Sequence, residues 1–136
     1  MVNAIVDSED KLVEKICSFR NDPLGFVYYA YPWGEKGGPL ELEAPDEWQK
    51  DLLNTIRDSL ESGVSDGEAI QLAVVSGHGI GKTCEVAWIV DWFISTRSHP
   101  QIVVTANTKS QLDTKTWREV SKWHNMSINK HWLPSS

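Results

Sequence analysis

The residues from Ser76 to Thr83 are the part of this sequence whose types and spacing point most directly to chemistry. They read Ser-Gly-His-Gly-Ile-Gly-Lys-Thr, with glycine at every second position from 77 to 81. Glycines let a backbone curl so that several N–H groups point inward and cradle an anion. A helix that begins at such a turn adds the positive end of its dipole. We therefore predict that this segment binds the phosphates of a nucleotide.

Each position of this turn has a predicted role. Lys82 is the candidate catalytic residue, because it would reach the β- and γ-phosphates of ATP as a point charge. The Thr83 hydroxyl would ligate the Mg²⁺ ion that bridges the same phosphates. The anion cradle would be made by the backbone N–H groups of Gly77, His78, Gly79, Ile80 and Gly81. The alternative is that the segment forms a tight strand–helix turn that binds no ligand.

A dinucleotide-binding site is the obvious rival, and the sequence argues against it. Its fingerprint spaces glycines as G-x-G-x-x-G, whereas here they run G-x-G-x-G. It also requires an acidic residue near the end of the second strand, and the segment Thr105-Ala106-Asn107 carries none.

The elements around the turn predict how it is positioned. Two short β-branched runs, 69–75 and 102–106, are typical of buried strands, and helices are expected over 82–96 and 110–126. Strand, helix, strand and helix in this order favour right-handed βαβ units. We therefore predict an α/β fold with a parallel sheet flanked by helices, of the P-loop NTPase type and incomplete.

The first half of the chain is predicted to be a helical and aromatic region. Apolar periodicity indicates helices over 8–20 and 46–60. The aromatic run 26–33 is expected to form a short strand or an extended segment. We place one region at 1–66 and the start of the ATPase core at 67–136.

Composition excludes several classes of protein. The chain has 136 residues, of which 40% are hydrophobic, and no stretch approaches the 18 apolar residues of a membrane span. Its first ten residues lack a secretory signal, and the lone Cys17 and Cys84 suit a reducing compartment. Residues 1–70 carry a net charge of −9 and residues 71–136 carry +3, so the second half tolerates a polyanion better.

The chain resembles the N-terminal part of a phage DNA-packaging terminase large subunit, the ATP-driven motor that pumps DNA into capsids. The likeness spans about 100 of the 136 residues, and its most particular part begins at Thr105-Ala106-Asn107-Thr108. It is carried by the segments Phe26–Glu35, Pro45–Leu53, Ser76–Thr83, Val103–Thr108, Gln111-Leu112, Thr114–Trp117 and Lys122–His124.

The resemblance implies an ATPase with ATP and Mg²⁺ as its ligands. It implies that Gln49, which lies 33 residues before Lys82, reads the adenine, as a side-chain amide that both donates and accepts hydrogen bonds. Taken alone, Gln49 would be an ordinary exposed helix residue. For the complete motor the resemblance implies double-stranded DNA, a portal and a small terminase subunit as partners, a homo-oligomeric assembly and the host cytoplasm as location.

The sequence departs from the family pattern at three places. Ser76 stands where the usual pattern has a glycine, and His78 stands where other members place an arginine, which is larger and always charged. The hydrophobic strand that ends in an acidic residue is also missing after Lys82. We therefore interpret the chain as the front part of a terminase, which binds nucleotide weakly and hydrolyses little or none.

A basic stripe on the last predicted helix is a candidate DNA contact. Lys115, Arg118 and Lys122 follow one another at helical spacing, and the alternative is a solvated helix face. Two other functions remain open for the whole chain. It is either a non-enzymatic remnant or interaction module, or a different P-loop ATPase such as a helicase loader.

Overall fold

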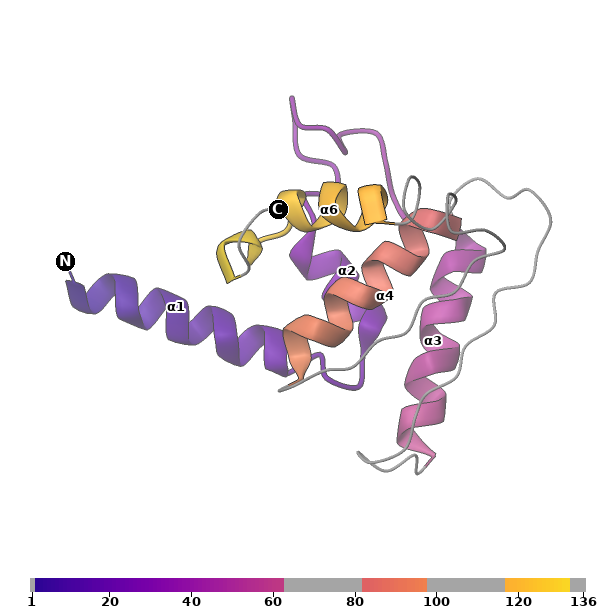
Figure 1. Ribbon diagram of the computed structural model, residues 1–136, viewed down its shortest axis with the longest axis horizontal. Helices are drawn as coiled ribbons and strands as arrows, with labels where there is room; N and C mark the ends of the chain where they lie inside the picture. Colours follow the sequence, from indigo (N-terminus) through magenta and orange to yellow (C-terminus); the bar gives the residue numbers. More distant parts are fainter. Residues whose placement is uncertain (1, 63–81, 98–116, 133–136) are drawn as a thin grey trace.

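The computed structural model describes residues 2–62, 82–97 and 117–132, and every regular element in these stretches is a helix (Figure 1). Helix makes up 69% of this part of the chain, and no strand occurs in it. The predicted α/β fold with a parallel sheet is therefore wrong. The two runs predicted as strands, 69–75 and 102–106, lie outside the described residues, and the described core is built by helices packed on helices.

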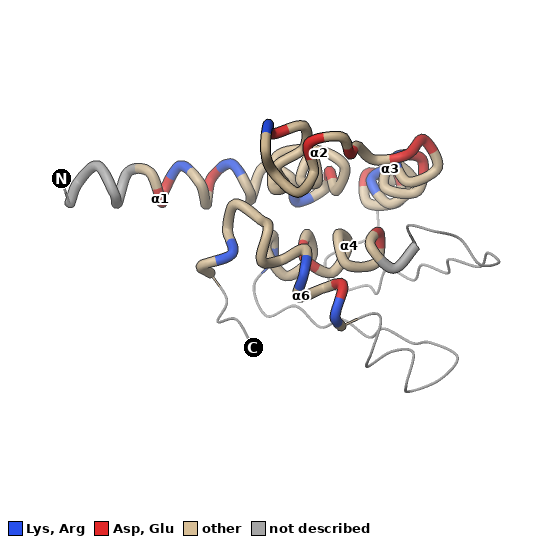
Figure 2. Tube along the Cα trace, turned by 90° about the horizontal axis from the view of Figure 1, so that it is seen from above, with Lys and Arg blue, Asp and Glu red and all other residues tan. Residues whose placement is uncertain are grey.

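The helices form two layers, as Figure 2 shows. One layer holds α1 (Val2–Cys17), α2 (Pro23–Ala30) and α3 (Glu47–Glu61). The other holds α4 (Lys82–Thr96) and α6 (Trp117–Met126), followed by the short 3-10 helix η2 (Lys130–Trp132). Acidic residues outnumber basic ones along α3, as the colours of Figure 2 show, whereas α6 carries Arg118 and Lys122 beside the single acid Glu119.

The helices that periodicity predicted are confirmed where the structure describes them. The helix predicted at 8–20 begins earlier and ends at Cys17, and the one predicted at 46–60 begins at Glu47 with Asp46 as its N-cap. The helix predicted at 82–96 has the bounds of α4. The helix predicted at 110–126 is confirmed from Trp117 onward, and its first part lies outside the described residues.

The aromatic run 26–33 is where local prediction was wrong, because most of it belongs to α2. The Asp22 carboxylate caps this helix by accepting a hydrogen bond from the Gly25 N–H at 3.1 Å, and Pro23 opens it. A larger residue at position 25 would displace the capping carboxylate and the Phe19 ring, since a Cβ there would lie 2.5 Å from Asp22 Oδ2 and 2.7 Å from that ring. The start signals therefore outweigh the β propensity of the aromatic residues that follow.

The central element of the core is α4. Its residues Ala87, Trp88, Val90 and Trp92 are all buried, although they point in different directions around the helix. The helix packs against α1, α2 and α6, and its contact with α6 is the most extensive. Since apolar surface on several sides of α4 is covered by other helices, the described core needs no sheet.

Aromatic rings fill the space between the two layers. Trp88 and Trp123 meet nearly at right angles with ring centroids 5.3 Å apart, and Tyr31 lies 5.2 Å from Trp123. Trp33 lies 5.6 Å from both tryptophans. Edge-to-face contacts of this kind add to the free energy gained by burying the rings. Trp88 and Trp92 are packing residues, because both are buried.

The 3-10 helix η2, at the end of the described chain, is hydrogen-bonded to α1 at its beginning. The Trp132 indole N–H donates to Glu9 Oε1 at 2.7 Å, and His131 Nε2 lies 3.0 Å from the same oxygen. These hydrogen bonds lower the pKa of the Glu9 carboxyl. The Ile128 N–H also donates to the carbonyl of Ala30 at the end of α2, at 2.8 Å. The segment after α6 therefore connects both layers.

Candidate functional site

The glycine-rich turn meets the described structure at the first residue of α4. Ser76 and the predicted cradle residues 77–81 lie outside the described residues. Lys82 and Thr83 are the first two residues of α4, and their side chains are not among those described. The predicted helix start is thus confirmed, and the backbone of both residues belongs to the helix turn with the free N–H groups.

Gln49 lies against this same turn. It occupies the third position of α3 and is 4% exposed. Its Oε1 accepts a hydrogen bond from the backbone N–H of Asp46 at 2.8 Å, and its Nε2 donates to Cys84 Sγ at 3.5 Å. The structure therefore places Gln49 of α3 against Cys84 of α4, the residue after Thr83. Sequence analysis on its own favoured an exposed position for Gln49.

Cys84 is held in an unreactive form at this junction. Burial raises the pKa of its thiol to about 12. The thiolate is the reactive form of cysteine, and it is scarce at physiological pH when the pKa lies so high. Cys84 is therefore a packing residue and a weak hydrogen-bond acceptor for Gln49.

Glu85 is a residue at this turn whose importance sequence analysis missed. Its side chain is 1% exposed, and neither carboxyl oxygen has a hydrogen-bond partner within the described part of the chain. Burial raises the pKa of this carboxyl to about 8, so it is mainly protonated at neutral pH. The available signal was an acidic residue directly before the apolar run from Val86 to Val90.

A second polar cluster, also missed, surrounds the buried Asp91. Tyr31 donates its hydroxyl to Asp91 Oδ2 at 2.7 Å, and His124 Nδ1 lies 3.2 Å from Oδ1. His124 Nε2 faces the carbonyl of Lys130 at 3.2 Å. Because both ring nitrogens face acceptors, the pKa of His124 is raised, chiefly by its hydrogen bond with Asp91. Burial and the Asp91 charge raise the pKa of Tyr31 well above its usual value.

The predicted DNA stripe is only partly described. Lys115 lies outside the described residues, whereas Arg118 and Lys122 are exposed on α6. Lys122 lies 3.9 Å from the Glu119 carboxylate and 5.8 Å from the centre of the Trp123 ring. The adjacent acid therefore offsets part of the positive charge of this face.

Two further classes of feature, a metal centre and a membrane span, are absent from the described residues. The described side chains contain no group of three or more His, Cys, Asp or Glu residues arranged to hold a metal ion. None of the described helices combines the length and the apolar character that crossing a bilayer requires.

Comparison with known proteins adds no relative. No family model, curated protein or solved structure matches this chain.

Proposed function

We propose that this chain binds an adenine nucleotide through Ser76–Thr83 and forms the front part of a viral terminase large subunit, the ATP-driven motor that moves DNA into a capsid. The observation that carries the proposal is the glycine-rich sequence followed directly by α4, which begins at Lys82. Phosphate binding at such a turn needs glycine backbone amides and a helix N-terminus, and it needs no particular sheet.

The neighbouring end of α3 supports the adenine side of this proposal. The N-terminal ends of α3 and α4 lie next to each other in Figure 1, and the contact between Gln49 and Cys84 joins them. Both helix ends carry partial positive charge, which favours an anion between them. To read an adenine, the Gln49 amide would exchange its hydrogen bonds with the Asp46 N–H and with Cys84 Sγ for hydrogen bonds to the base.

We expect the chain to bind ATP with little turnover. Activation of the attacking water needs an ionised carboxylate near Mg²⁺. Asp91 is occupied by Tyr31 and His124, and Glu119 accepts the Trp123 indole N–H at 3.0 Å. Glu85 is mainly protonated near neutral pH. For the complete motor, the proposed partners are DNA, the portal and the small subunit. Its proposed state is a homo-oligomer in the host cytoplasm.

The test is a calorimetric titration with a non-hydrolysable ATP analogue and Mg²⁺. We expect saturable binding that Lys82→Ala abolishes and that exceeds binding of the matching GTP analogue. Lys50→Ala is the control, because it removes the same charge from a partly exposed site beside Gln49, where Lys50 pairs with Glu47 at 3.0 Å. Gln49→Ala should remove the preference for adenine while phosphate-dependent binding persists.

Two results would contradict the proposal. Binding that survives Lys82→Ala, or that falls equally in Lys50→Ala, would show that the glycine-rich turn is not the site. ATP turnover above that of Lys82→Ala would leave the binding assignment standing but overturn the expectation of an inactive motor fragment.

The second candidate is a non-enzymatic interaction module, and one observation favours it. Among the described residues, the N-terminal half exposes four large apolar side chains, Val13 at 42%, Tyr28 at 46%, Leu42 at 95% and Trp48 at 40%. Exposed aromatic residues are common in protein interfaces. If the titration shows no nucleotide binding, this surface becomes the better account of the chain.

A further inference from the structure

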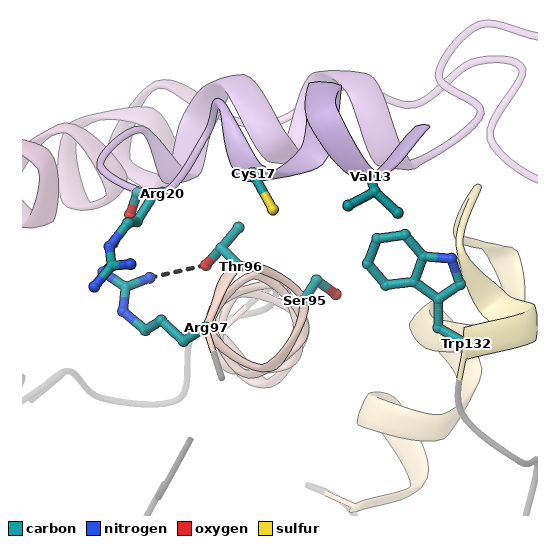
Figure 3. Close-up of a pocket in the computed structure, with 7 residues that line it drawn as sticks. All are labelled: Val13, Cys17, Arg20, Ser95, Thr96, Arg97 and Trp132. Carbon is teal, nitrogen blue, oxygen red and sulfur yellow. Dashed lines mark hydrogen bonds between the residues drawn. The ribbon is translucent and has the colours of Figure 1, made fainter. Parts of the chain in front are cut away.

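We draw no further inference here: the strongest candidate, the pocket of about 360 Å³ between α1, α4 and η2 (Figure 3), carries none, because the Ser95, Thr96 and Arg97 side chains that line it already hydrogen-bond to other groups of the protein and nothing in the described part of the chain shows what would occupy it.

Discussion

Within the described part of the chain, the two halves of α4 differ in whether their buried polar groups are hydrogen-bonded. In the second half, Asp91 is bonded on both oxygens, the Trp92 indole donates to the Phe19 carbonyl at 2.7 Å, and the Thr96 hydroxyl donates to the Trp92 carbonyl at 2.7 Å. In the first half, the Glu85 carboxyl oxygens and the Trp88 indole N–H have no partner among the described residues.

Asp91 and its partners Tyr31 and His124 form an anchor between helices, whereas the first half of α4 is an energetically costly segment. A buried polar network with its hydrogen bonds made stabilises one arrangement of the helices, whereas a buried group without a partner costs free energy. Proteins commonly retain such a cost where function requires it. The costly half of α4 is the half that the glycine-rich turn enters, which agrees with the proposed binding role of that end.

Removing Asp91 should have the largest effect, because it dismantles the anchor. Asp91→Ala leaves the Tyr31 hydroxyl and the His124 ring without their shared buried acceptor. We expect the free energy of unfolding to fall by about 3–5 kcal/mol, as when one partner of a buried pair is deleted. Urea denaturation followed by circular dichroism measures it.

Asp51→Ala is the matched control, since it makes the same substitution at an exposed position of α3. It should change the free energy of unfolding by no more than about 0.5 kcal/mol. Equal effects of the two substitutions would show that the Asp91 network is not an anchor.

Neutralising Glu85 should raise the free energy of unfolding, whereas Asp91→Ala should lower it. The pKa of this carboxyl rises from 4.5 to about 8 on burial, so the folded state holds a proton that the unfolded state releases. Stability is therefore full below about pH 4.5 and falls as the pH rises toward 8. Glu85→Gln removes this loss, and we expect it to stabilise the protein by roughly 2–4 kcal/mol at pH 8.5 and hardly at all at pH 4.5.

The measurement is a pair of urea titrations at these two pH values, with Glu14→Gln on the exposed face of α1 as the control. A Glu85→Gln protein that is less stable than the parent at pH 8.5 would mean that the ionised carboxylate has a partner in the folded state. In that case the contrast between the two halves of α4 would be lost.

How much of this could be predicted from the sequence depends on how local each signal is. The start of α4 at Lys82, and the start of α3 to within one residue, followed from residues within one helical turn. The run 26–33 was misassigned because a cap and a proline just before it outweigh the strand propensity of its aromatic residues. The sheet was inferred from β-branched runs, which by themselves do not distinguish a strand from another apolar segment.

The polar networks could not be predicted because their members are far apart in the chain. Asp91 meets Tyr31 and His124 at sequence separations of 60 and 33 residues, and no periodicity links them. Gln49 was selected through a family resemblance, yet its contact with Cys84 depends on how α3 packs beside α4. Sequence therefore indicated candidate residues, and only the packing of helices could decide which of them meet.

The smallest effect that tests the comparison concerns His124, which joins α6 to the anchor. Its raised pKa means that the folded state binds the proton more tightly than the unfolded state. The resulting stabilisation is complete below about pH 6.5 and is lost as the pH rises through the pKa of the folded state. We expect His124→Gln to cost about 1.5–3 kcal/mol at pH 5.5, the usual contribution of a hydrogen bond between charged groups, and less at pH 8.5. Urea titrations at both pH values measure this, and Asn125→Gln at an exposed position of α6 is the control. Parallel pH profiles for the parent and His124→Gln would show that the imidazolium does not hold α6 on α4, and that the anchor consists of Tyr31 and Asp91 alone.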